Sequence, residues 1–322
     1  MTGASIKKAF TIGVCRRPAG RMWCPALTLL WLILAAQFAT AAEIVILKSS
    51  DIAAYNQAIA GFKAALPANT ILSEYDLQGD LEKGRKLAWK IRASDPALVL
   101  AVGLKAAKAA QLEIVDIPVV YAMVLDPLKY GLTSRNMTGV LLEVPVERQL
   151  ALIRSVFPNL KRIGTLYDPS KTAATIDEAR RLIKANGTEL VPTQVSSERD
   201  VPSALRTLLP SVGALWLVPD STVLSDDSLR FILNAALEEH VPVIGFSKDF
   251  ARSGALLCLS VNYGDIGRQA GQLAQRILDG QVTLPLKPLH PDRLELSLNL
   301  KTAKFLGIDI PKEIESKADE IY

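Results

Sequence analysis

The chain has 322 residues, of which 49% are hydrophobic, enough for one large domain or two of ordinary size. It carries 37 Lys and Arg against 33 Asp and Glu, but five of these bases lie in the first 42 residues, which contain no acid. Taking those five away leaves 32 bases against 33 acids in the rest of the chain. This near-neutral balance leaves no basic footprint, so binding of nucleic acid is not expected.

Residues 1–42 have the three parts of a secretory signal peptide. A basic region precedes an apolar run of 14 residues at 25–38, and small residues follow up to Ala41 and Ala42. Because a membrane-spanning helix needs about 20 apolar residues, a cleaved signal is favoured over a retained anchor. We expect cleavage after Ala41 or Ala42 and export to the periplasm, with either Met1 or Met22 as the start of translation.

From residue 43 onward, strand-like and helix-like segments alternate, a pattern that indicates parallel sheets with helices on both faces. Before Pro145 we expect strands at 44–47, 71–75, 98–102, 119–121 and 140–142, and helices at 53–65, at 81–91 and after Gly103. After Pro145 we expect strands at 162–167, 189–195, 214–218, 243–246 and 256–260, and helices at 147–157, 173–185, 201–209, 228–239 and 266–278.

The two parts of this alternation resemble each other. Residues 117–126 (IPVVYAMVLD) and 241–250 (VPVIGFSKDF) share the order branched residue, Pro, apolar strand, turn and Asp. The repeat favours two similar doubly wound α/β lobes over one extended sheet. Gly267 and Gly271 are spaced four residues apart on the last long helix, which indicates close packing of that helix against a sheet.

Ligands of parallel α/β sheets bind where strands end and helices begin, so the residues at these points are the candidate ligand contacts. In the first part, Ser49 and Ser50 offer hydroxyls for an anion or cap the next helix. Gly103 allows a ligand close to the backbone or forms a tight turn, and Lys105 pairs with an acidic group or, as favoured, stays in solvent. Met123 offers a pliable apolar surface. Asp126 binds ligand or caps a turn before Pro127.

The second part offers a matching set of candidates at three further strand ends. An aromatic face with a few fixed polar groups is typical of a small-molecule pocket. The residues are Tyr167, Asp168, Asp220, Ser221, Thr222, Phe246 and Ser247.

No motif for catalysis, a metal or a cofactor is found. There is no glycine-rich phosphate loop. His240 and His290 are the only histidines, have no metal-ligand spacing, and are expected to be structural. Cys258, the one cysteine after the leader, and Trp216 are expected in the core. We therefore expect no enzyme activity and no cofactor.

Taken together, several segments resemble the substrate-binding proteins of ABC transporters related to the tryptophan-binding TrpX type. The resemblance covers residues 43 to 322 and is carried by AVGLKAAKAA, IPVVYAMVLDP, NMTGVLLEVPVERQLALIRSVFPNLKRIGTLYDPS, GALWLVPDSTV, LRFILNAALEEHVPVIGFS, GALLCLSVNYGDIGRQAGQLAQRIL and LNLKTAKFLGIDIP.

The resemblance implies a type I periplasmic-binding-protein fold with two lobes joined by a hinge of three chain crossings. The first lobe would comprise residues 43–140 plus 260–284, and the second 141–259 plus 285–322. Hinge closure around a ligand is the known behaviour of periplasmic binding proteins, and the closed form would dock on a membrane permease.

The resemblance favours a monomeric periplasmic protein that captures a small metabolite, such as an amino acid, for an ABC importer. The same lobes suit a sensory partner of a membrane receptor. An exported α/β enzyme is a third hypothesis, which the absence of a nucleophile–base pair disfavours.

Overall fold

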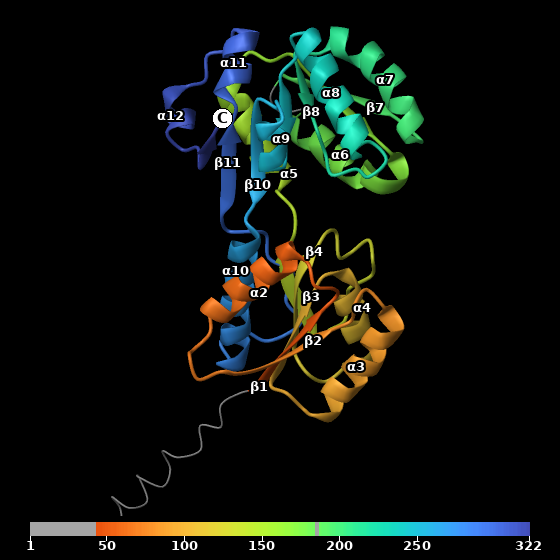
Figure 1. The fold of residues 1–322 in the computed structure, drawn as a ribbon, viewed down its shortest axis with the longest axis vertical. Helices are drawn as coiled ribbons and strands as arrows, with labels where there is room; N and C mark the ends of the chain where they lie inside the picture. The colour runs from red at the N-terminus through yellow and green to blue at the C-terminus, as the bar shows by residue number, and fades with distance from the viewer. Residues whose placement is uncertain (1–42, 184–186) are drawn as a thin grey trace, which may run out of the picture. The chain divides into compact units, whose positions relative to one another are not determined.

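The structure is a computed structural model that describes residues 43–183 and 187–322. The predicted signal peptide lies outside these residues. The strands form two separate sheets, one of five strands and one of seven (Figure 1). No helix in the described ranges is long and apolar enough to cross a membrane.

The first sheet has the strand order β2-β1-β3-β4-β5, with all neighbours parallel. Its strands are β1 (Glu43–Lys48), β2 (Ile71–Asp76), β3 (Leu98–Val102), β4 (Val119–Val124) and β5 (Met137–Leu141). Fully buried runs in β3, β4 and β5 are typical of parallel strands covered on both faces.

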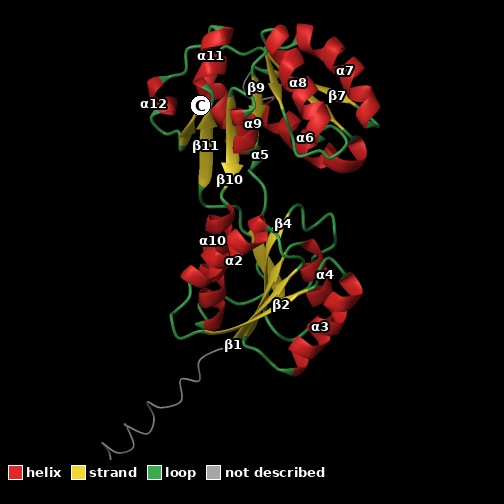
Figure 2. Ribbon diagram, viewed as in Figure 1, coloured by secondary structure: helices red, strands yellow, loops and turns green. Residues whose placement is uncertain are grey.

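Helices cover both faces of this sheet, and strand residues alternate between two hydrophobic clusters. On one face, α3 (Leu81–Ala93) and α4 (Leu104–Glu113) pack over Val45, Val99 and Val119. On the other, α2 (Ala53–Ala64) and α10 (Tyr263–Leu278) pack over Ile44, Leu100 and Val120. Figure 2 shows these helices flanking the strands. The first part of the chain is therefore doubly wound, as predicted.

Gly267 and Gly271 allow α10 to pack tightly against another helix. A Cβ atom at Gly267 would lie 1.8 Å from the carbonyl oxygen of Ala58, and one at Gly271 would lie 2.7 Å from that of Phe62. Both carbonyls belong to α2. The expected close packing exists, but its partner is a helix and not a sheet, because α10 comes from much later in the chain and shares the α2 face.

The second sheet has the strand order β12-β11-β10-β9-β8-β6-β7. Its strands are β6 (Arg162–Tyr167), β7 (Glu189–Gln194), β8 (Ala214–Trp216), β9 (Val243–Gly245), β10 (Leu257–Val261), β11 (Leu294–Leu298) and β12 (Glu320–Ile321). Its helices are α5 (Val146–Val156), α6 (Pro169–Ile183), α7 (Val201–Leu208), α8 (Asp226–Glu238), α9 (Lys248–Arg252), α11 (Leu300–Leu306) and α12 (Lys312–Glu315).

One edge of this sheet departs from the parallel pattern. β11 runs antiparallel to β10, with Leu257 opposite Leu298 and Val261 opposite Leu294. The sheet is therefore mixed. The alternation rule did not predict β11, since it lies after the last long helix and has no partner helix–strand unit.

The chain passes between the two sheets three times. It leaves β5 for α5, leaves β10 for α10, and returns after α10 to β11. The first and third passages run side by side, because Val140 bridges Leu289 and the N–H of Leu141 donates to the carbonyl of Leu289 at 2.9 Å. The exact bounds of the two lobes stay a prediction.

Candidate ligand-binding site

The carboxyl ends of β1 and β3 meet at Ser49 and Gly103. The Ser49 hydroxyl accepts a hydrogen bond from the N–H of Ala106 at 2.9 Å and thereby caps α4. Gly103 has a φ of +85°, and a Cβ there would lie 2.6 Å from the Tyr55 hydroxyl and 2.7 Å from the Ser49 hydroxyl. Only glycine fits this position. Ser49 thus caps a helix, but a different one from the helix that follows it.

Ser50 and Lys105 lie close to this junction. Ser50 is partly buried and has no side-chain hydrogen bond to any residue that the structure describes. Lys105 is exposed, and its ammonium group donates to the carbonyl of Gly79. The amine is therefore held near the end of β2, where it contributes a positive charge to the rim of the first sheet.

The end of β4 contains two residues in the left-handed region of backbone conformation. Met123 has a φ of +60° and Asp126 one of +46°, and the β4–β5 pairing shifts register between Tyr121 and Val124. Residues other than glycine rarely adopt such backbone angles, and strained positions of this kind are often found at functional sites. The Met123 side chain is buried in the core beneath the strand end, while Asp126 accepts a hydrogen bond from the N–H of Lys129 at 3.1 Å.

In the second part, Asp168 and Asp220 hold two neighbouring strand ends together. The Asp220 carboxylate accepts from the N–H of Asp168 at 2.8 Å and from the Thr172 hydroxyl at 2.6 Å. The Asp168 carboxylate accepts from the hydroxyls of Thr222 and Ser170, both at 2.7 Å. The hydrogen bond from Thr222, followed by those from Ser170, lowers the pKa of Asp168. Both carboxylates are buried and partnered, so they position the loops on which other candidates stand.

The remaining candidates of the second part differ in accessibility. Tyr167 is buried, and its hydroxyl accepts a hydrogen bond from Gln194 at 3.1 Å. Ser221 is exposed and accepts from the Lys171 ammonium group at 2.8 Å. Phe246 packs edge-on against Phe250 at 5.1 Å between ring centroids. Ser247 caps α9 through the N–H of Asp249 at 3.3 Å.

A cavity of about 1010 Å³ opens at these strand ends and at the passages between the sheets. This volume is at the upper end of the range for small-molecule sites. Of the candidates named above, Asp126, Ser221 and Phe246 line it. Residues that the sequence analysis did not select line it as well, and these are chiefly Tyr130, Glu143, Arg148 and Lys171. His290, expected to be structural, is also part of the wall.

Sequence reasoning missed the residues on the passages between the sheets because it searched only strand ends. Glu143 and Arg148 flank Pro145, where the periodic pattern stops and restarts. A charged residue beside such a break was the available signal. Lys129, on the loop after β4, donates to the carbonyl of Lys171 at 3.0 Å and to that of Ser170 at 3.3 Å, so the cavity wall is closed by a contact between the two parts.

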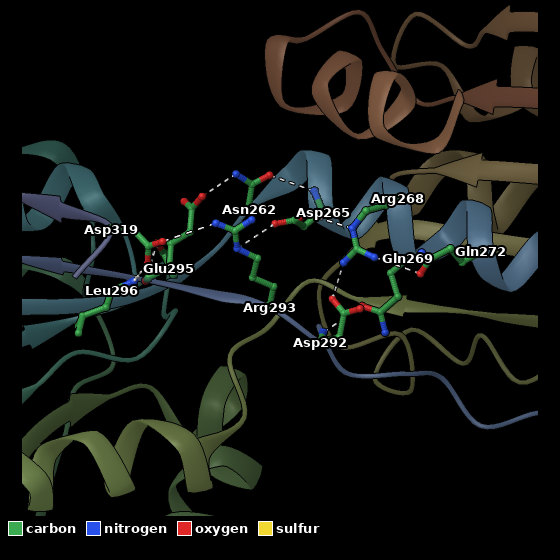
Figure 3. Close-up of polar contacts among 11 residues, drawn as sticks. Asn262, Asp265, Arg268, Gln269, Gln272, Asp292, Arg293, Glu295, Leu296 and Asp319 are labelled. Carbon is green, nitrogen blue, oxygen red and sulfur yellow. Dashed lines mark hydrogen bonds and ion pairs between the residues drawn. The ribbon is translucent and has the colours of Figure 1, made fainter. Parts of the chain in front are cut away.

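A polar network ties two of the passages together beside the cavity (Figure 3). Arg268 of α10 pairs with Asp292 at 2.8 Å and with Asp265 at 3.1 Å. Arg293 lies 3.6 Å from Asp265 and 3.6 Å from Asp319, which stands just before β12. Arg293 thus bridges a helix of the first part and a carboxylate of the second, at the position where a hinge between them would bend.

A family model described as ABC transporter substrate binding protein matches residues 43–322. The chain belongs to this family. Family membership confirms the resemblance found in the sequence, and members of the family are substrate-binding proteins, which are not enzymes. No group of three or more His, Cys, Asp or Glu that could hold a metal ion occurs among the residues described by the structure.

Two curated relatives cover similar shares of the chain. A tyrosine-binding protein of Clostridioides difficile is 27% identical over 239 residues, covering 72% of this chain and 69% of the relative. An uncharacterized protein of Rickettsia prowazekii is 22% identical over 225 residues, covering 69% of this chain and 70% of the relative.

Solved structures share the fold over nearly the whole of their length. The ligand-free, open structure of a substrate-binding protein with adhesive properties from Clostridium difficile has a TM-score of 0.74 and 23% identity, and covers 87% of this chain and 98% of its own. A Streptococcus pneumoniae domain in complex with L-Trp has a TM-score of 0.62 and 21% identity, and covers 88% of this chain and 100% of its own. These likenesses confirm the predicted two-lobed, type I periplasmic-binding-protein fold.

Proposed function

We propose that this protein captures an amino acid with an aromatic side chain in the cavity and delivers it to the permease of an ABC importer. The observation that carries the proposal is the combination of family membership with a cavity whose wall carries aromatic side chains and charges of both signs. The predicted signal peptide supports a site of action outside the cytoplasmic membrane.

The cavity wall offers the three kinds of group that a free aromatic amino acid requires. Tyr130 and Phe246 provide aromatic surface. Arg148 and Lys171 provide positive charge for a carboxylate, and Glu143 provides negative charge for an ammonium group. The names of the relatives agree with this class, since one is a tyrosine-binding protein and one solved structure holds L-Trp.

Binding energy in this site would come from both parts of the protein. Asp126, Lys129 and Tyr130 lie on the loop between β4 and β5 in the first part. Lys171, Ser221 and Phe246 lie on a helix and loops of the second part. A ligand that touches both sets favours the conformation in which they are close, and so shifts the population of hinge states. The permease would then recognise that conformation.

The test is a thermal unfolding screen of the purified protein against the twenty amino acids and matching carboxylic acids. A ligand present at 100 times its dissociation constant should add about 2.7 kcal/mol of stability. We expect tyrosine or tryptophan to give the largest shift. A screen in which no amino acid raises the melting temperature, while another class of metabolite does, would contradict the proposed ligand class.

Delivery to a permease requires a second experiment in cells. Deleting the gene should reduce uptake of the labelled amino acid that gives the largest shift, and deleting the permease should reduce uptake equally. Uptake that persists after both deletions would contradict delivery of this amino acid through the importer.

A further inference from the structure

Six carboxylates line the cavity, and three of them are engaged by the protein itself. Asp126 accepts a hydrogen bond from a backbone N–H at 3.1 Å, Asp292 pairs with an arginine at 2.8 Å, and Asp319 accepts from a backbone N–H at 2.8 Å. These groups serve the turns and the network beside the cavity. Each of them already has a partner in the protein that stabilises its charge.

The other three carboxylates differ in their exposure. Glu147 and Glu178 are exposed, so water solvates their charges. Glu143 is partly buried and makes no hydrogen bond or ion pair with any residue in the described ranges. Glu143 is therefore the one carboxylate of the cavity wall that has lost water without gaining a partner.

A carboxylate in this state is energetically unfavourable in the empty protein. Removing an ionised group from water costs free energy unless a partner replaces the lost hydrogen bonds. Burial raises the pKa of Glu143, the nearby charges of Asp126 and Glu178 raise it further, and His290 opposes the rise. No described residue supplies the missing partner, and Glu143 faces the cavity, so a bound ligand is the group that can supply it.

The position of Glu143 brings it to any ligand that spans the cavity. It lies two residues after β5 and three before α5, on the first passage between the sheets. The third passage runs alongside, with the N–H of Leu141 bound to the carbonyl of Leu289 at 2.9 Å, and this pairing brings His290 near Glu143. Glu143 therefore stands where the two parts of the protein meet, in the wall of the cavity.

Resting on the proposed function, we propose that Glu143 binds the ammonium group of the ligand and so makes the site selective for amino acids over the corresponding carboxylic acids. An ammonium group has three donors and a full charge, and it meets the unpaired oxygens of Glu143 with charge-assisted hydrogen bonds. A ligand without this group leaves the carboxylate desolvated and unpaired.

The experiment compares two ligands that differ only in the amino group, using titration calorimetry at pH 7 on the purified protein. The ligands are L-tyrosine and 3-(4-hydroxyphenyl)propionate, with L-tryptophan and indole-3-propionate as a second pair. The wild type should prefer the amino acid of at least one pair. Glu143→Gln should weaken binding of that amino acid by about 10-fold to 100-fold, the worth of a hydrogen bond to a charged group. It should bind the carboxylic acid at least as well as the wild type does, because no unpaired charge is then left beside that ligand.

Two further variants serve as controls. Glu239→Gln makes the same change of charge at an exposed site outside the cavity and should bind both ligands as the wild type does. Glu143→Asp keeps the charge on a shorter side chain and should retain part of the preference for the amino acid. Circular dichroism and thermal unfolding check that each variant is folded.

The outcomes separate this inference from the proposed function. Equal affinity of the wild type for a bound amino acid and its des-amino partner overturns the role of Glu143, whatever the variants do. Binding of the amino acid that is unchanged in Glu143→Gln overturns it too, while the proposed function stands. Failure of the wild type to bind any amino acid overturns both.

Discussion

Single residues at the strand ends are held by backbone and hydroxyl groups more than by ion pairs. Ser49 caps α4, and the Asp220 carboxylate accepts a hydrogen bond from the N–H of Asp168. Each side chain therefore orients a loop through its hydrogen bond. The sequence predicted that polar residues stand at these ends. It did not predict which of these polar side chains form hydrogen bonds within the protein. That depends on which loops from distant parts of the chain lie within about 3 Å of them.

Glu143→Gln tests the cost of the unpaired carboxylate through the pH dependence of stability. The pKa of Glu143 is raised above its ordinary value of 4.5 in the folded protein, so the folded state holds the proton more tightly than the unfolded chain. The free energy of unfolding of the wild type should therefore fall as pH rises from 4.5 through the folded pKa. Glutamine does not titrate, so the variant should be more stable than the wild type at pH 7.

Urea denaturation between pH 4 and pH 8 measures this difference. The two curves should converge near pH 4, where Glu143 is protonated in both states, and separate above it. The Glu239→Gln control should follow the wild type throughout. Curves for Glu143→Gln and wild type that stay parallel over the whole range would show that Glu143 is well solvated.

Gly103→Ala tests the close approach at the end of β3. Its φ of +85° and ψ of 164° suit only glycine, and a Cβ would meet the Tyr55 and Ser49 hydroxyls at 2.6 and 2.7 Å. We expect a loss of about 2–4 kcal/mol in the free energy of unfolding from strain and overpacking together. Gly131→Ala, with a φ of +64° and no atom within 4 Å, should lose only about 1 kcal/mol. Urea denaturation measures both variants. Equal losses of stability in Gly103→Ala and Gly131→Ala would contradict the close approach of Gly103 to the Tyr55 and Ser49 hydroxyls.

At the scale of elements, the alternation of strands and helices was predicted almost throughout, and bounds such as Leu98–Val102 and Arg162–Tyr167 agree with the structure. Periodicity succeeds here because both faces of the sheets are covered, which forces a buried run in each central strand. It did not predict β11, α11 and β12. Of these, β11 pairs antiparallel with β10, and β12 pairs parallel with β11. No local pattern distinguishes such an edge from a loop.

Gly267→Ala tests the packing of α10 on α2. Alanine has the better helix propensity by about 1 kcal/mol, so propensity alone predicts stabilisation. The added Cβ would lie 1.8 Å from the carbonyl oxygen of Ala58, however, and backbone cannot move aside without separating the helices. We expect the steric clash to outweigh the helix propensity. The free energy of unfolding, measured by thermal or urea denaturation, should fall by about 1–3 kcal/mol.

The matched control on the same helix is Gln272→Ala. Gln272 is exposed, so the substitution should change stability by no more than about 0.5 kcal/mol. A Gly267→Ala protein as stable as this control would mean that α10 does not touch α2 as closely as the structure has it.

At the scale of the whole molecule, the described residues form four hydrophobic clusters, two on each sheet. The buried members of each cluster come from one sheet and its covering helices. The partly buried Val261, at the end of β10, packs against a cluster of the first sheet. The parts are connected by three chain passages, by Lys129 and by the network around Arg293. The ion pairs of Arg293 are 3.6 Å long and the Arg293 side chain is exposed, so they contribute about 0–1 kcal/mol.

Separate cores predict that the ligand-free protein does not unfold as a single unit. In scanning calorimetry the measured enthalpy should exceed the van't Hoff enthalpy, which indicates more than one transition. A saturating ligand that contacts both parts should raise the temperature of the lower transition. The ratio of the measured enthalpy to the van't Hoff enthalpy should then come closer to one. A ratio of one without ligand would show that the passages couple the two cores strongly.

The sequence by itself determined the class of the protein. The near-neutral charge after residue 42, the alternation of strands and helices, and the family could all be read from it, because each depends on local composition or on order along the chain. Only the tertiary structure decided the site. Met123 and Tyr167 are buried, and Asp168 and Asp220 form hydrogen bonds that hold the loops. Glu143 and His290 lie in the cavity wall. Burial and partnership are properties of neighbours in space, and the neighbours of Glu143 come from segments up to about 150 residues away.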